Sequence, residues 1–174
     1  MKSLENYLKA VLYAYPLLKN IEEDYETHIR NKALLSYDSN WATERLAEYL
    51  AEEILHKNKL LWLRKVIETA LDKLSGTERL LMGLRYFGKA RGKKPTGEEG
   101  VQEPYCWSER KYFRVQNRLS QKVTGIMVAL GLTKAYFDEE LSELDEIKKI
   151  YRFVELGRDR EIAKDERRWL GGNA

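Results

Sequence analysis

An all-α fold, a helical bundle with a long N-terminal helix, is predicted by two observations. Apolar residues recur at spacings of three and four through most of the 174-residue chain. Helix breakers are scarce, since the prolines are only Pro16, Pro95 and Pro104. The apolar fraction of 43% is sufficient for a core, and the charged fraction of 34% indicates long exposed helix faces.

The first helix is predicted over residues 3–31. Its apolar stripe runs from Leu4 to Ile29, and Pro16 within it predicts a kink or a split near Tyr15. Such a stripe is too apolar to be left in water. It packs either against the helices that follow or, as a coiled-coil arm, against a second copy in a homodimer.

Two more helices are predicted after a connection at residues 32–41. One covers residues 43–56 and the other residues 60–74, each with its own apolar stripe. The polar segment 56–59, His-Lys-Asn-Lys, is interpreted as the turn between them.

The middle of the chain is predicted to contain two helices separated by a loop. Thr77 is the expected N-cap of a helix over residues 78–87. Residues 88–106 contain four glycines and two prolines and predict a flexible loop or a short hairpin. Ser108 is the expected cap of a strong helix that ends at Gly131.

The C-terminal part is predicted to be helical as well. Thr133 caps a short helix that ends near Leu144, and a further helix covers residues 145–156 before Gly157. The chain thus divides into a helical or oligomerisation region 1–58, a region 59–131 and a C-terminal helical region 132–174.

Several classes of function are not expected from the composition. Cys106 is the single cysteine, which indicates a reducing compartment, and no signal peptide or membrane span is present, so we expect a cytoplasmic protein. His28 and His56 are far apart and have no ligand spacing, and no catalytic motif occurs. We expect no enzyme, no cofactor and no metal site.

Charge is distributed unevenly along the chain. Between Arg85 and Lys122 there are ten bases and four acids, whereas residues 137–155 carry seven acids and three bases. A basic middle followed by an acidic segment is typical of a site for a polyanion.

The helix that begins at Ser108 concentrates the basic residues on one side. Arg110, Arg114 and Arg118 recur every four residues and therefore share a face. Such a face can lie along phosphates and reach base edges in the major groove. The candidate DNA-binding residues are Arg110, Lys111, Arg114, Asn117, Arg118 and Lys122 on the helix, with Gln116 nearby, and Lys89, Arg91, Lys93 and Lys94 in the loop.

Part of this region resembles a known DNA-binding module. The stretch Leu74–Phe87, LSGTERLLMGLRYF, is similar to the entry helix of sigma-factor region four, which also occurs in the ArpU and RinA types of phage and mobile-element regulators. In that family a second DNA-binding helix begins at a serine and has apolar residues four and seven positions later. Ser108, Tyr112 and Val115 match these offsets. The resemblance implies a helix-turn-helix in region 59–131.

The sequence departs from the family pattern between these two helices. Family members place a short scaffold helix there, where this chain has the loop 88–106. Either the scaffold helix is degenerate around Glu98–Tyr105, or the loop replaces it as a wing-like insertion.

Three functions are compatible with these features. The first is a sequence-specific transcription regulator of the phage or mobile-element type that binds double-stranded DNA, with RNA polymerase or another host protein complex as the expected protein partner. The alternative is a phage-type inhibitor or adaptor that binds a host nucleoprotein complex through its helical and basic surfaces. The third is an RNA or single-strand binder whose stacking platforms would be Tyr105, Trp107, Tyr112 and Phe113. The third is disfavoured because these aromatics fall mostly on the predicted buried side.

Overall fold

The computed structural model describes residues 4–35, 42–88 and 107–157, and every regular element in these ranges is a helix. The all-α prediction is therefore confirmed for the described part of the chain. The elements are α1 (Asn6–Leu35), α2 (Thr43–Asp72), α3 (Gly76–Tyr86), α4 (Glu109–Ala129), α5 (Lys134–Tyr136), the π-helix η2 (Phe137–Leu141) and α6 (Asp145–Glu155).

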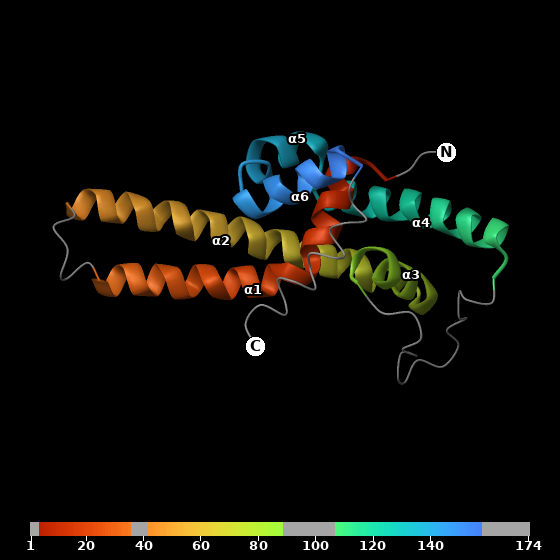
Figure 1. Ribbon diagram of the computed structural model, residues 1–174, viewed down its shortest axis with the longest axis horizontal. Coiled ribbons are helices and arrows are strands. Elements are labelled where there is room, and N and C mark those ends of the chain that lie inside the picture. The colour runs from red at the N-terminus through yellow and green to blue at the C-terminus, as the bar shows by residue number, and fades with distance from the viewer. Residues whose placement is uncertain (1–3, 36–41, 89–106, 158–174) are drawn as a thin grey trace.

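Helix α1 is continuous but bent. It contains Pro16, and Figure 1 shows its red N-terminal part steeply inclined to the orange remainder. Proline lacks the backbone N–H that would close the previous turn, and its ring presses on the preceding carbonyl, which bends a helix. The predicted kink is present, and the predicted alternative of a split is not.

Helices α1 and α2 form an antiparallel pair that extends to one side of the molecule (Figure 1). The prediction that the N-terminal helix packs against residues 43–74 is confirmed, and α1 also contacts α6. The turn predicted at residues 56–59 is wrong, because α2 runs through it without a break. The predicted boundary between residues 58 and 59 thus falls within a helix.

The physical reason for the missing turn is the contacts that these polar residues make. His56 lies edge-on to Tyr25 of α1, with the ring centroids 6.3 Å apart. Lys57 pairs with Glu26 at 3.5 Å, and Lys59 pairs with Glu140 at 2.9 Å. None of these residues strongly disfavours a helix, so contacts with other helices decide whether residues 56–59 form a turn or continue α2.

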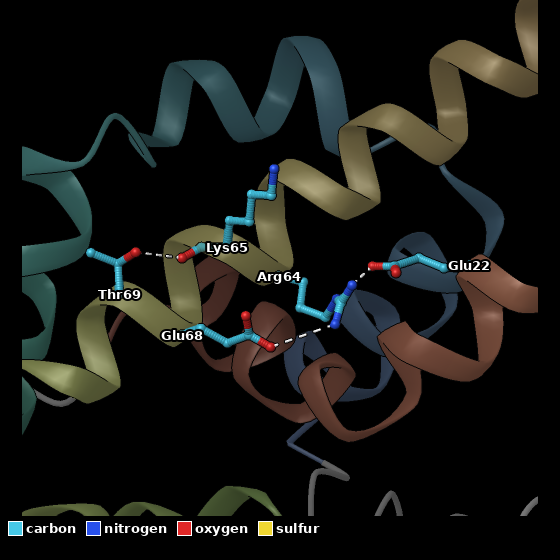
Figure 2. Close-up of polar contacts among 5 residues, drawn as sticks. All are labelled: Glu22, Arg64, Lys65, Glu68 and Thr69. Atoms are coloured by element: carbon cyan, nitrogen blue, oxygen red, sulfur yellow. Dashed lines mark hydrogen bonds and ion pairs between the residues drawn. The ribbon is translucent and has the colours of Figure 1, made fainter.

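A polar pair also connects α1 to α2 inside their interface. The guanidinium of Arg64 donates to the carboxylate of Glu22 over 2.9 Å, and Glu22 is only 6% exposed (Figure 2). Glu68, one turn along α2, lies 3.7 Å from the same guanidinium. In Figure 2 the Thr69 hydroxyl points back to the carbonyl of Lys65 on its own helix, outside this pair.

The helix ends follow the capping residues, with one correction. Ser75, not Thr77, caps α3, because its hydroxyl accepts from the N–H of Glu78 while the Glu78 carboxylate accepts from the N–H of Ser75. Ser108 caps α4 and Thr133 caps α5, as predicted. Gly131 ends the α4 turn with a φ of 101°, which favours glycine.

A single hydrophobic cluster joins all three regions that the sequence suggested. It runs from Leu4, just before α1, to Val154 in α6 and includes buried residues of every helix except α5. The ring of Phe137, fully buried, lies 5.6 Å from Tyr7 and 5.1 Å from Tyr151, centroid to centroid. Short helices α5, η2 and α6 thereby cover the bent part of α1 (Figure 1). Among the described helices, none has the length and apolar character needed to cross a bilayer.

Candidate nucleic-acid interface

Helix α4 is held to the rest of the molecule by one face. Leu119, Val123 and Met127, spaced four residues apart, are at most 2% exposed and belong to the core. The helix packs against α2 and extends away from the α1–α2 pair, on the same side as α3 (Figure 1). Because its buried stripe is narrow, the opposite face of α4 is left to solvent.

Three arginines form that outer face, which we name the arginine face: Arg110, Arg114 and Arg118. All three are exposed, and none forms an ion pair with another described residue. Positions four apart are rotated by only about 40° on a helix, so the three side chains leave from one side. Glu109 is the only acid in α4. Among the described residues, the arginine face is therefore a positive stripe without an acidic partner.

Two of the other predicted residues border this face. The ammonium of Lys111 lies 4.7 Å from the ring centroid of Trp107, a cation–π arrangement, and Lys111 is half-exposed. Asn117 is half-exposed, one turn after Arg114. Both remain accessible for a ligand.

The suggestion that Gln116 takes part in binding is wrong. Its side chain is 4% exposed, and its amide donates to the hydroxyl of Tyr112 over 3.3 Å. Gln116 lies one position before Asn117, and this 100° rotation moves it from the outer face to the core.

Lys122 is turned toward α3 and not toward the arginine face. Its ammonium donates to the Glu78 carboxylate over 2.8 Å, and the same carboxylate accepts from the Ser75 N–H over 2.9 Å. Burial alone would raise the pKa of Glu78, but the hydrogen bonds from Lys122 and Ser75 outweigh burial and lower that pKa. We refer to Ser75, Glu78 and Lys122 as the α3–α4 clamp, because they fix the start of α3 to α4.

The remaining predicted residues lie outside the described part of the chain. These are the loop bases Lys89, Arg91, Lys93 and Lys94, together with the segment Glu98–Tyr105 where a scaffold helix was considered. The described chain contains the first and last helices of the predicted module, α3 and α4, joined by the clamp. The helix-turn-helix itself stays a prediction.

On the outer side of α4, sequence reasoning named Phe113 only as a stacking platform of the disfavoured third function and did not single out Gly125. Phe113 is 45% exposed between Arg110 and Arg114, although the aromatics of this helix were expected on the buried side. Gly125 has open space around its Cβ position, with no heavy atom within 4 Å. On a helical wheel, Gly125 lies almost opposite the buried stripe of Leu119, Val123 and Met127, whereas Phe113 lies at the edge of that stripe.

A second group of polar residues lies between α1, α2 and α6. The pKa of Tyr25 is raised, mainly because its side chain is buried. The carboxylate of Glu146, which accepts a hydrogen bond from the Tyr25 hydroxyl, raises this pKa further. Nearby, Nδ1 of His56 is 4.0 Å from a carboxylate oxygen of Glu53. Tyr25 thus connects α1 to α6 through Glu146 and to α2 through its ring contact with His56. Within the described ranges no three His, Cys, Asp or Glu residues are placed to hold a metal ion.

Similarity to known proteins gives no further information on the site. The resemblance of Leu74–Phe87 to the entry helix of sigma-factor region four stays a prediction, based on the residues of α3 and α4. Comparisons with protein families, with curated proteins and with solved structures find no match to this chain.

Proposed function

We propose that the protein is a sequence-specific DNA-binding regulator of the phage or mobile-element type, and that it binds duplex DNA through the arginine face of α4. The observation that carries the proposal is the set of exposed arginines Arg110, Arg114 and Arg118, which lack an acidic partner among the described residues. DNA-binding proteins commonly hold a helix to their core by its apolar face and turn the opposite, positively charged face toward the DNA.

The dimensions of the arginine face suit the major groove. With its side chains an α-helix is about 10–12 Å across and the major groove is about 12 Å wide, so α4 fits in the groove with the arginine face toward the DNA. Arginine donates two parallel hydrogen bonds either to a phosphate or to the O6 and N7 atoms of guanine. The free N–H groups at the Ser108 end favour an anion there as well.

The function is tested by selecting bound sequences from random duplex DNA with the full chain, and then measuring affinity at several salt concentrations. Enrichment of one motif is expected. Each of Arg110→Ala, Arg114→Ala and Arg118→Ala should weaken binding. An arginine that reads a base contributes roughly 1–3 kcal/mol, and one that contacts a phosphate lowers the salt slope by about one when removed.

The matched control is Arg152→Ala, which removes an exposed arginine from α6. This variant should bind like the parent chain. If the three α4 variants also bind like the parent, or if no motif is enriched, the proposal is wrong.

One observation favours a second function, that of an inhibitor or adaptor that binds another protein. The α1–α2 pair exposes large apolar side chains, which are Leu34 at 63% near the end of α1, and Leu55 at 57% and Ile54 at 45% near the middle of α2. Recovery of a partner after nuclease treatment, lost in Leu55→Asp and retained in Arg114→Ala, would support this second function.

A further inference from the structure

The outer side of α4 contains an aromatic ring that the described part of the chain leaves exposed. Phe113 is 45% exposed and stands between Arg110 and Arg114 in the chain. Its described ring contact is with its neighbour Tyr112, whose centroid is 5.7 Å away. Tyr112 is half-buried and contacts the core, whereas Phe113 is turned one position further out.

The surroundings of Phe113 indicate the chemistry of what it meets. Arg110 is three residues before it and Asn117 is four residues after it, so all three occupy adjacent positions on the helix surface. Glu109, four residues before Phe113, is the acid beside it in α4, whereas Arg110 and Asn117 lie on its other side, toward the arginine face. No acid occurs between Lys111 and Lys122. A partner that covers Phe113 and also reaches the arginine face combines negative charge with an apolar feature.

Duplex DNA combines negative charge and an apolar feature in its major groove. The phosphates carry the negative charge, and the C5 methyl group of thymine is the apolar feature that the groove presents. From Arg110 to Asn117 the helix rises roughly 10 Å, about three base-pair steps of 3.4 Å. The aromatic ring therefore lies among side chains that reach neighbouring base pairs of one site.

We propose that Phe113 determines specificity by packing against the C5 methyl group of one thymine in the target site, beside the groups that Arg110 and Arg114 bind. The inference rests on the proposed function, because it requires α4 to lie in the major groove. It goes beyond that function by assigning one base to one residue. The ring contributes contact and not charge, so its effect is on sequence preference and not on the salt slope.

The test uses the full chain and the duplex selected for it. Each thymine of the motif is replaced, one at a time, by uracil, which lacks only the C5 methyl group. The parent chain should bind one of these duplexes about fourfold more weakly, the value expected for loss of one buried methyl group. Phe113→Ala should bind the thymine and uracil duplexes equally, because the group that senses the methyl is absent.

The matched control is Val128→Ala, which removes another exposed apolar side chain from the same helix. It should keep the fourfold preference for thymine. Phe113→Leu should keep part of it, and the melting temperature of each variant confirms that the fold is intact. Comparing protein and DNA changes together isolates the pair from any effect of uracil on DNA shape.

The outcomes are separable. If the parent chain binds a motif but no thymine is sensitive to loss of its methyl, the inference is overturned while the proposed function stands. It is also overturned if Phe113→Ala keeps the parent's preference. If no duplex is bound through the arginine face, the proposed function fails, and the assignment of Phe113 fails with it.

Discussion

Basic side chains on α4 differ in whether they are available to a ligand. A single contact within the protein makes the difference. Arg114 and Arg118 extend into solvent, whereas Lys122, one turn later, is held by Glu78 at 2.8 Å. The charge of Lys122 is already balanced within the protein. A count of the basic residues along α4 therefore overestimates the positive charge that is available to bind a polyanion.

Lys122→Met should therefore leave the salt slope of DNA binding unchanged. The variant loses a partly exposed ion pair, so its free energy of unfolding should fall by about 0.5 kcal/mol. Salt titrations alongside Arg114→Ala, together with urea unfolding, measure both effects. A slope lowered by about one would mean that Lys122 leaves Glu78 to bind a phosphate.

Gly125 is the second residue whose role depends on its surroundings. No heavy atom lies within 4 Å of its Cβ position, and glycine within a helix is less favourable than alanine. Gly125→Ala should raise the free energy of unfolding by about 1 kcal/mol. Gly131→Ala is the control and should destabilise, because Gly131 has a φ of 101°. Thermal unfolding of both variants checks this, and a less stable Gly125→Ala would show that the space is occupied.

Among the elements, the α3–α4 clamp makes the junction sensitive to acid. The pKa of Glu78 lies below its ordinary value of 4.5, so the folded state favours the ionised carboxylate. The stabilisation that the ionised Glu78 gives to the folded state is complete above pH 4.5. It is lost as the pH falls through the lower pKa that Glu78 has in the folded state.

Glu78→Gln keeps an acceptor for the Ser75 N–H but loses the charge that binds Lys122. We expect the variant to be less stable than the parent at pH 7, and the difference to shrink below pH 4.5 as the parent's carboxylate becomes protonated. Urea unfolding from pH 7 to pH 3 follows this change. A difference that is constant across the range would exclude the clamp as its source.

The α1–α2 pair depends on a buried carboxylate that one arginine neutralises. Arg64→Met leaves Glu22, 6% exposed, without its counter-charge. The expected loss of stability is about 2 kcal/mol, below the range for fully buried pairs because Arg64 is itself 29% exposed. The double variant Glu22→Leu/Arg64→Met should recover most of that loss. If the double variant is as unstable as the single one, the pair has a role beyond charge balance.

At the scale of the whole molecule, one core connects the three regions that the sequence suggested. Leu8 is fully buried in the part of α1 that is surrounded by the other helices, whereas Leu34 at the other end of α1 is 63% exposed. The position along a single helix therefore sets how much each leucine contributes.

Leu8→Ala should lower the free energy of unfolding by roughly 2–5 kcal/mol, because it leaves a cavity that the packed helices fill poorly. Leu34→Ala should change it by less than about 0.5 kcal/mol. Both variants should unfold in one cooperative transition by circular dichroism and by tryptophan fluorescence. Two separate transitions would mean that the C-terminal helices fold independently of α1.

The sequence by itself determined the helical nature of the described chain and most of its helix ends. Apolar spacing, the caps Ser108 and Thr133, and the glycine at position 131 act within a few residues, so they can be recognised without the fold. The capping box of Ser75 and Glu78 is equally local, although the predicted cap is Thr77.

The tertiary structure alone decided which of the predicted site residues are available. Arg110, Arg114 and Arg118 remain open, Lys122 is bound by a residue 44 positions away, and Gln116 is buried. It also joined residues 43–72 into one helix, through contacts of His56, Lys57 and Lys59 with other helices. Local propensities between these alternatives differ by only a few tenths of a kcal/mol per residue, so contacts between distant segments determine the result.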